Sequence, residues 1–369
     1  MKKLSIISIT FSLSILFAVA IVAPVAAQNT VEDQYWDLVK DSKEVMDFKS
    51  YLKEYPTGKF AAIANLKISQ LSGQPGTNAT SPNPTRSTPQ NSVRVRNDPA
   101  GFTNYEVVQT SATTGAPNSL GEVSVVCPAN KKVLGGGFWS NFGNEIVRVW
   151  RNYPVDDGGR QIGDRGWYIS FTSVTSGQLI WVRAVCASVP NELGYEIVNT
   201  GLLTNASGTS GEGSVSCPAN KKVLSGGYST SAGLESWRVS QNLALDSNGQ
   251  PGDRGWGLRF ESLREGQNAF VVAICASVPD SLGLEAVQAT ATTGSTGSLG
   301  SVSVVCPANK KVLGGGYWSN DGFEVARVWR NRAIDTGGRQ TGDRGWGIDF
   351  TSVTGGRSFW AQAICGFVN

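Results

Sequence analysis

Hydrophobic and polar positions follow two different periods along this chain. In residues 28–72, apolar side chains recur every three or four positions, as at Phe48 and Leu52, which is the spacing of one face of an amphipathic helix. Pro56 interrupts this pattern, so we expect one helix to end there and another to follow it. The same spacing predicts a short first helix around Trp36. The segment is therefore predicted to be a short α-helical hairpin.

The chain from residue 101 to residue 369 has a different pattern. Short apolar runs rich in Val, Ile, Phe and Trp are bounded by Gly, Asn, Asp and Pro, which is typical of β-strands joined by tight turns. In the first part of this region the expected strands are 105–110, 123–127, 133–140, 146–151, 167–173 and 180–187. The fold class is therefore predicted to be mainly β.

The stretch CPANKKVL occurs three times in this region, beginning at Cys127, Cys217 and Cys306. Each copy is followed by a Gly-rich aromatic run, by the motif GDRGW and by a second cysteine. Self-similarity at a fixed period indicates one folding unit in tandem, so we predict three tandem β-sandwich-like modules. The loop of each motif is expected to be a hairpin turn, with Asn130 in the left-handed region. A threefold cluster and a linear row of modules are both open.

Each module carries two of the six cysteines. Many pairings are open to six cysteines, but a repeat of self-contained units selects the pairs within each unit. The predicted disulfides are Cys127–Cys186, Cys217–Cys275 and Cys306–Cys365. Paired cysteines of this kind form in an oxidising compartment outside the cytosol.

The first 27 residues have a positive start, an apolar run and small residues before a cleavage point, which is the pattern of a secretory signal peptide. An uncleaved anchor helix is the alternative. We expect a secreted, periplasmic or cell-surface protein with no membrane span after signal cleavage. A segment rich in Pro, Ser and Thr is expected to be a flexible linker. The predicted organisation is a signal peptide at 1–27, a helical segment at 28–72, a linker at 73–100 and β-modules at 101–188, 189–277 and 278–369.

The amino-acid composition excludes several classes of catalytic and metal-binding site. The chain has no histidine, which removes Ser-His-Asp and Cys-His catalysis and most transition-metal sites. Two cysteines per unit cannot complete a zinc site. The net charge of +3 gives no clustered basic excess of the kind that nucleic-acid binding needs. Enzymes that use only carboxylate or Lys groups are left as a third alternative. We predict a protein that is not an enzyme, holds no metal or cofactor and does not bind nucleic acid.

Acidic loops in the modules are the one candidate for calcium. They begin at Asp156, Asp246 and Asp335 and bring Asp close to Gly. Their spacing is not that of an EF-hand, and plain turns are the expectation.

Two stretches resemble known families. The run DFKSYLKEYPTGKFAAIANLKI resembles a tetratricopeptide-like helical hairpin, which implies a small docking piece or a protein partner bound through residues 31–71. The motif CPANKKVLGGG is similar to a CPAGKKVLGGG-like signature of tandem β-modules in uncharacterised secreted bacterial proteins. That resemblance implies an extracellular β-module, and it brings no activity and no catalytic residues.

The three modules can be compared with one another. Tryptophans at one position of every copy (Trp167, Trp256 and Trp346) are predicted to be core. At three other positions the first and third modules carry Trp or Arg where the second has Ser or Gln. Replacing two core indoles by Ser would cost about 3–5 kcal/mol each, so we expect these positions to be exposed, unless Trp237 refills the space. The predicted binding residues are Trp139, Trp150 and Arg151 in the first module and Trp318, Trp329 and Arg330 in the third.

Exposed indoles beside arginines are typical binding anchors, since aromatic faces stack on sugar rings and guanidinium groups pair with carboxylate or sulfate. The predicted function is non-catalytic binding or adhesion, with a polysaccharide, glycoconjugate or other surface polymer as partner. The alternative is a structural or assembly protein in which these indoles pack between modules and the modules contact other proteins.

Overall fold

The computed structural model describes residues 101–140, 144–321, 323–337 and 342–368, together with residues 45–72 and Glu32, Trp36, Val39, Lys40 and Ser42. The predicted signal peptide and linker lie outside these residues. The chain divides into two compact units, residues 1–90 and 91–369, which are described separately. No helix in the described part of the chain is long and apolar enough to cross a membrane.

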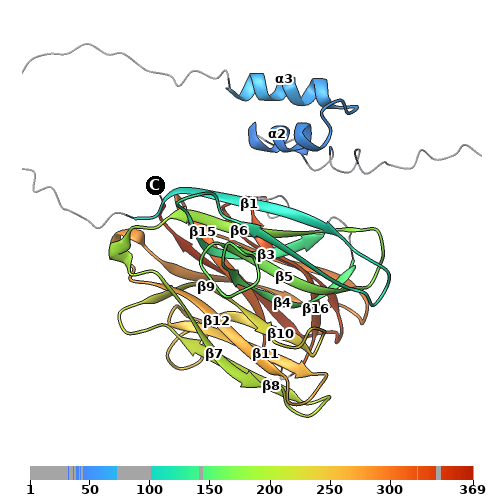
Figure 1. The fold of residues 1–369 in the computed structure, drawn as a ribbon, viewed down its shortest axis with the longest axis vertical. Helices are drawn as coiled ribbons and strands as arrows, with labels where there is room; N and C mark the ends of the chain where they lie inside the picture. Colours follow the sequence, from blue (N-terminus) through green and yellow to red (C-terminus); the bar gives the residue numbers. More distant parts are fainter. Residues whose placement is uncertain are drawn as a thin grey trace, which may run out of the picture. The chain divides into compact units, whose positions relative to one another are not determined.

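The N-terminal unit contains the predicted helical hairpin. Helix α2 (Val45–Glu54) and helix α3 (Ala61–Ser72) lie side by side in Figure 1. The ring of Trp36 stacks on Phe60 with centroids 4.8 Å apart and meets the edge of Tyr51. The Tyr51 hydroxyl donates to Glu32 and accepts a bond from the Phe60 amide. An aromatic cluster therefore holds this small unit together, since two short helices cannot build a large core.

The described part of the C-terminal unit contains 18 strands, six from each repeat, which confirms the predicted mainly β class. The first repeat supplies β1 (Thr103–Thr113), β2 (Leu120–Val126), β3 (Lys132–Ser140), β4 (Val147–Val155), β5 (Gly166–Ser173) and β6 (Leu179–Ser188). The second supplies β7 (Glu196–Leu203), β8 (Ser210–Ser216), β9 (Lys222–Thr230), β10 (Trp237–Leu245), β11 (Gly255–Ser262) and β12 (Asn268–Ala276). The third supplies β13 (Glu285–Thr292), β14 (Leu299–Val305), β15 (Lys311–Ser319), β16 (Ala326–Ile334), β17 (Gly345–Ser352) and β18 (Ser358–Gly366).

Neighbouring repeats share their sheets. One six-stranded sheet has the order β2-β5-β4-β9-β12-β7, a second β13-β18-β15-β10-β11-β8 and a third β1-β6-β3-β16-β17-β14. We call them the 1–2, 2–3 and 3–1 sheets after the repeats that build them. Each repeat gives half of its strands to each of two sheets, so the third repeat returns to the first (Figure 1). The threefold cluster is therefore the observed arrangement, and the linear row is not.

The two halves of each sheet meet at a single antiparallel residue pair. These pairs are Asn152–Tyr228, Asn242–Tyr317 and Phe138–Asn331. A Cβ atom on Gly137 would lie 1.9 Å from the carbonyl oxygen of Asn331, and Gly227 and Gly316 face the same restriction. The last glycine of each Gly-rich run is thus required because two backbones meet there.

The first position of each Gly-rich run lies where all three repeats converge. A Cβ atom on Gly135 would come within 2.3 Å of the Leu313 carbonyl oxygen and 2.9 Å of the Ser225 hydroxyl. Gly314 lies against the same serine. One small side chain therefore fills the centre, which explains why the second copy carries Ser where the others carry Gly.

The three tryptophans predicted to be core are fully buried. Their indole N–H groups donate to buried asparagine oxygens at 2.6–2.7 Å: Trp167 to Asn152, Trp256 to Asn242 and Trp346 to Asn331. Because these asparagines also form the sheet junctions, each core indole fixes the contact between two repeats.

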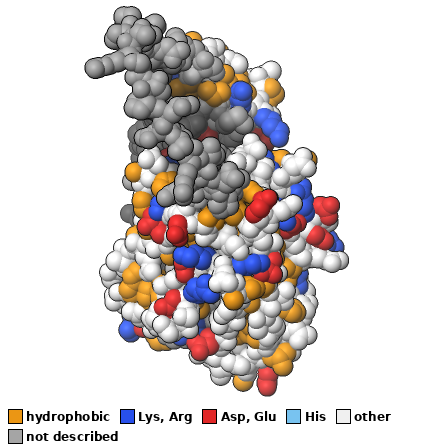
Figure 2. Space-filling view, turned by 90° about the vertical axis from the view of Figure 1, so that its left-hand side faces the viewer, with side chains coloured by type: hydrophobic (Ala, Val, Ile, Leu, Met, Phe, Trp, Pro, Cys, Tyr) orange, Lys and Arg blue, Asp and Glu red, His pale blue; other side chains and the backbone are white. Residues whose placement is uncertain are grey.

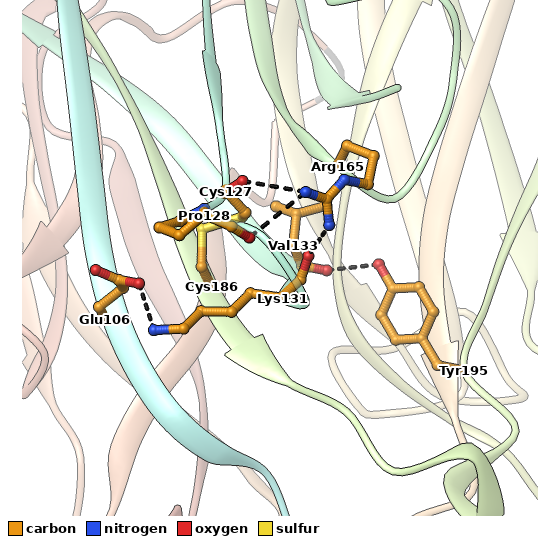
Figure 3. Close-up of a disulfide and its surroundings, with 8 residues drawn as sticks. All are labelled: Glu106, Cys127, Pro128, Lys131, Val133, Arg165, Cys186 and Tyr195. Atoms are coloured by element: carbon orange, nitrogen blue, oxygen red, sulfur yellow. Dashed lines mark hydrogen bonds and ion pairs between the residues drawn. A yellow bond between two sulfur atoms is a disulfide. The ribbon is translucent and has the colours of Figure 1, made fainter. Parts of the chain in front are cut away.

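The disulfides are those that the repeat predicts. Cys127–Cys186, Cys217–Cys275 and Cys306–Cys365 each close a loop within one repeat. Figure 3 shows the surroundings of the first, where Lys131 pairs with Glu106 and the Arg165 guanidinium donates to the carbonyls of the CPANK loop. Asn130 has φ 64°, as predicted for the turn.

The neighbouring Asp and Arg of the GDRGW motif bind different partners in or next to the CPANK loop. Asp164 pairs with Lys132 at 3.0 Å, and Arg165 donates to the Lys131 carbonyl. The same division recurs in the other repeats, where Asp253 pairs with Lys222 and Asp343 with Lys311. The motif therefore connects the GDRGW loop to the CPANK loop, because its Asp and its Arg both bind groups of the CPANK loop or of the residue that follows it.

Candidate functional site

The predicted binding residues lie at the three sheet junctions, and three of the six are buried. Trp139, Trp150 and Trp329 are 8%, 3% and 4% exposed, whereas Trp318 is partly exposed. The expectation of exposure is thus wrong for the first three. The cavity argument fails because the second repeat carries a buried indole, Trp237, near the place of Trp150 and Trp329, and leaves a hollow at the place of Trp139.

Trp150 and Trp329 are the extra residues of β-bulges in β4 and β16. In the second repeat the bulge residue is Ser240, and the indole is supplied by Trp237 three positions earlier. Trp237 is 1% exposed, and its N–H donates to the Trp150 carbonyl at 2.9 Å. The second repeat therefore keeps a buried indole near this place while carrying Ser at the bulge.

The arginines beside these bulges bridge repeats. The Arg151 guanidinium lies 4.8 Å above the Trp150 ring and donates to the Thr230 and Ala232 carbonyls of the second repeat. Arg330 lies 4.7 Å above Trp329 and donates to the Ser140 carbonyl. Gln241 makes the equivalent bond to the Ser319 carbonyl. These contacts are the packing between modules that the sequence left as the alternative.

Trp139 and the equivalent residues Ser229 and Trp318 lie on the outer faces of the three sheets. The surroundings of this position differ from one sheet to the next. In the 3–1 sheet the Trp139 ring stacks on Trp181 with centroids 4.3 Å apart. The guanidinium groups of Arg183 and Arg332 lie 4.8 and 5.0 Å from its centroid. Burial lowers the pKa of Arg332 to about 10. Trp139 is therefore enclosed between cations and a second indole.

In the 2–3 sheet the same indole pair is left uncovered. Trp318 stacks on Trp360 at 4.2 Å, and both rings are partly exposed. The positions of Arg183 and Arg332 are taken by Gln362, which bonds the Ala244 backbone instead, and by the shorter Leu243. The Trp318 N–H donates to the Gln288 amide oxygen at 3.2 Å. This pair is a flat aromatic surface with a polar edge.

In the 1–2 sheet the indole is absent and a hollow takes its place. Ser229 pairs across the strands with Phe270, and the hollow of about 240 Å³ is lined by Arg151, Tyr153, Arg160 and both of these residues. Burial raises the pKa of Tyr153, whose hydroxyl donates to the Arg160 carbonyl. The hollow therefore combines aromatic, cationic and hydroxyl groups.

A hydrogen-bonded chain lies beside this hollow. Arg160 pairs with Glu122 at 2.5 Å, Glu122 accepts a bond from the Tyr168 hydroxyl, and Tyr168 accepts one from Ser170. Burial, followed by the bond to Glu122, raises the pKa of Tyr168. The tyrosine hydroxyl thus stays protonated and donates to the carboxylate at neutral pH.

The loops considered for calcium use their carboxylates locally. Asp156 accepts bonds from the Arg160 and Gln161 amides, and Asp246 accepts bonds from the Asn248 and Gln250 amides. Within the described residues no three Cys, His, Asp or Glu side chains are grouped to hold a metal ion. The geometry of these loops is that of side-chain-capped turns.

Sequence reasoning finds Trp318 but misses its partner and the hollow. Trp181, Phe270 and Trp360 lie at one repeated position on neighbouring strands. That they pair with Trp139, Ser229 and Trp318 depends on strand register, which the repeat alone does not give. The shared aromatic position is the signal that could have found them.

Comparison of the chain with models of protein families gave no match, and comparison with curated proteins gave none either. The likeness to tandem β-modules of secreted bacterial proteins therefore stays a prediction.

Proposed function

We propose that this is an exported, non-catalytic protein that binds glycans through the Trp318–Trp360 pair on the 2–3 sheet. The single observation that carries the proposal is the contrast between two equivalent indole pairs. In one pair Trp139 is buried against Arg183 and Arg332, whereas in the other both rings are partly exposed. Partly exposed indoles on a rigid sheet are typical of binding surfaces.

The chemistry of the pair suits a sugar ring. Stacked indoles 4.2 Å apart offer an aromatic face and a rigid edge, and such side chains lose little conformational entropy on binding. The Gln288 amide at the edge supplies polar atoms for sugar hydroxyls. Three disulfides support export, because they persist in oxidising compartments.

The charges on one face of the molecule agree with a ligand of this type. On the face shown in Figure 2, Lys and Arg side chains lie among Asp and Glu and form no single basic area. Adhesion to a polyanion along a broad basic face would need such an area. Recognition by local aromatic sites is the better fit.

The test is a glycan array probed with the full chain and with Trp318→Ser. We expect binding to a subset of neutral oligosaccharides, weakened at least about tenfold in the variant, since Ser229 shows that a sheet junction tolerates Ser at this position. The matched control is Trp139→Ser, which removes the enclosed indole and should lower stability while leaving binding unchanged. Equal binding by Trp318→Ser and the unmodified chain would contradict the proposal.

A second candidate function is protein binding through residues 31–71. On α3 the side chains of Ile63 and Leu66 are 46% and 56% exposed, although the unit has too few residues to build a concave groove alone. Substituting both by Ser should abolish capture of a protein partner without unfolding the helices. Partner capture that survives the double substitution would argue against this function.

A further inference from the structure

The hollow on the 1–2 sheet contains a cation, Arg151, that pairs with no carboxylate in the described part of the chain. At the equivalent position of the other two sheets the residue is either paired with a carboxylate or uncharged. Arg330 in the 3–1 sheet pairs with Asp349 at 2.8 Å. In the 2–3 sheet the position is the neutral Gln241. Arg151 in the 1–2 sheet faces Ser170 across the strands, at the place of Asp349. Within the described residues no carboxylate lies within ion-pair distance of Arg151, so its charge is compensated only by the Thr230 and Ala232 carbonyls.

The absence of an indole is what opens this place. Trp139 and Trp318 fill the equivalent positions by stacking on the aromatic ring of the neighbouring strand. Ser229 leaves the corresponding face of Phe270 facing the hollow. At about 240 Å³ the space is below the roughly 300–1,000 Å³ of sites for drug-sized ligands. It therefore suits a single ring better than an extended chain.

The other lining groups have complementary roles. Tyr153 and Phe270 supply aromatic surface, and Ser229 supplies a hydroxyl group. Arg160 is largely exposed and already paired with Glu122, so it adds little net charge. The uncompensated charge is that of Arg151, which is held in place by its two backbone bonds and by the Trp150 ring.

We propose that this hollow is a second saccharide site, selective for a sugar ring that carries an anionic substituent, with a carboxylate or sulfate placed against Arg151. It goes beyond the Trp318–Trp360 surface, because it lies on another sheet, contains no indole in its lining and depends on charge. A fixed guanidinium beside an aromatic ring suits an anionic sugar, since it makes charge-assisted hydrogen bonds to the anion while the ring stacks.

The experiment is calorimetric titration of the full chain with three probes: an oligouronate hexamer, a sulfated neutral hexasaccharide and the same hexasaccharide without sulfate. We expect at least one anionic probe to bind at least about tenfold more tightly than the uncharged one, which corresponds to about 1.4 kcal/mol. The comparison of oligouronate with sulfated sugar identifies the anionic group. Equal affinity for all three probes, or binding of none, would overturn the proposal.

Two substitutions that the chain itself uses at equivalent positions test the site. Arg151→Gln copies the second repeat, and Ser229→Trp copies the first and third, so both variants should fold. We expect Arg151→Gln to remove the preference for the anionic probe, and Ser229→Trp to block the hollow and abolish its binding. Arg330→Gln is the matched control, which should leave the anionic preference unchanged.

The variants also separate this site from the proposed glycan surface. Trp318→Ser should weaken binding of the uncharged probe and leave the preference for the anionic probe unchanged. If Trp318→Ser instead removes the anionic preference while Arg151→Gln keeps it, the proposal that the hollow is the anionic site fails. The proposal that the Trp318–Trp360 pair binds glycans then stands. If Arg151→Gln acts as expected while Trp318→Ser has no effect, the hollow stands and the proposed function of the Trp318–Trp360 pair fails.

Discussion

At the residue scale, the Gly-rich runs show how one sequence motif serves three different contacts. The first glycine lies at the centre of the three repeats, the second lies against a core indole, and the third lies at a sheet junction, as Gly135, Gly136 and Gly137 illustrate. None of these has a positive φ, so space and not backbone conformation is the reason for glycine. Such positions are sensitive to a single methyl group.

Gly316→Ala tests this account of the junction. The added Cβ would lie 1.8 Å from the Asn242 carbonyl oxygen, and since a backbone atom cannot swing away, we expect a loss of about 1–3 kcal/mol in the free energy of unfolding. Urea unfolding of the full chain measures it. Gly233→Ala is the control, because its added methyl group would have no neighbouring atom within 4 Å. Equal stability of the two variants would show that the junction adjusts freely.

At the element scale, the strands and the disulfides of the repeats could be predicted from the sequence, and the sheets could not. All six expected strands of the first repeat are present, because their apolar runs and turn residues are local signals. The pairing of β4 with β9, or of β16 with β3, joins residues far apart in the chain through one residue pair each. Local patterns carry no information about such contacts.

The same limit explains the outcome for the candidate site. Trp139 and Trp318 look alike in the sequence, and only their neighbours across the junction decide their exposure: Arg332 comes from β16 and Leu243 from β10. The sequence does indicate that Trp237 could refill a gap, and in the structure Trp237 is buried and donates to the Trp150 carbonyl. From the sequence, Ser229 indicates only that the second repeat lacks a tryptophan at this position. The sequence does not show whether other side chains fill the space or leave a hollow there.

The first residues of β4, β10 and β16 and the residues just before them together form a ring of alternating charges, with an arginine at the second position of each strand and a glutamate two residues before its start. Arg148 lies 3.7 Å from both Glu145 and Glu235, and Arg327 lies 3.3 Å from Glu324 and 3.9 Å from Glu145. These side chains surround a cavity of about 30 Å³ between the three repeats. Burial raises the pKa of the Glu145 and Glu324 carboxyls, although the arginines oppose it.

This ring predicts a pH dependence of stability. A carboxyl whose pKa is higher in the folded than in the unfolded state stabilises the fold most below its ordinary pKa of 4.5, and that contribution is lost as the pH rises through the folded value. Glu324→Gln removes one carboxyl that destabilises the folded state when it ionises. The free energy of unfolding of the variant, relative to that of the unmodified chain, should therefore increase as the pH rises from about 4 to 7. Arg327, Arg238, Arg148, Glu145 and Glu235 stay in place in the variant.

Unfolding of both proteins in urea across this pH range provides the measurement. Glu212→Gln is the control, since Glu212 is an exposed carboxylate outside the ring. A stability difference between Glu324→Gln and the unmodified chain that stays constant, or that shrinks as the pH rises, would contradict the assignment of raised pKa values to the ring.

At the scale of the whole molecule, three similar repeats close into one body with three unlike outer faces. The interior is nearly threefold, with the same disulfide, the same indole–asparagine bond and the same junction in every repeat. The outer positions differ: an indole pair with one ring buried under arginines, an indole pair with both rings partly exposed, and a hollow that contains Arg151, which pairs with no carboxylate of the described residues. The shared features stabilise the fold, and we infer that the differences set what each face binds.

The most direct test of this inference is an NMR titration that follows the indole N–H signals of the full chain as a bound oligosaccharide from the array is added. The account predicts shifts for Trp318, whose N–H lies at the polar edge of the pair, and for Trp360. The N–H signals of Trp167, Trp256 and Trp346, which are bonded to buried asparagines, should not move. Saturating ligand that leaves the Trp318 and Trp360 signals unchanged would contradict the central claim.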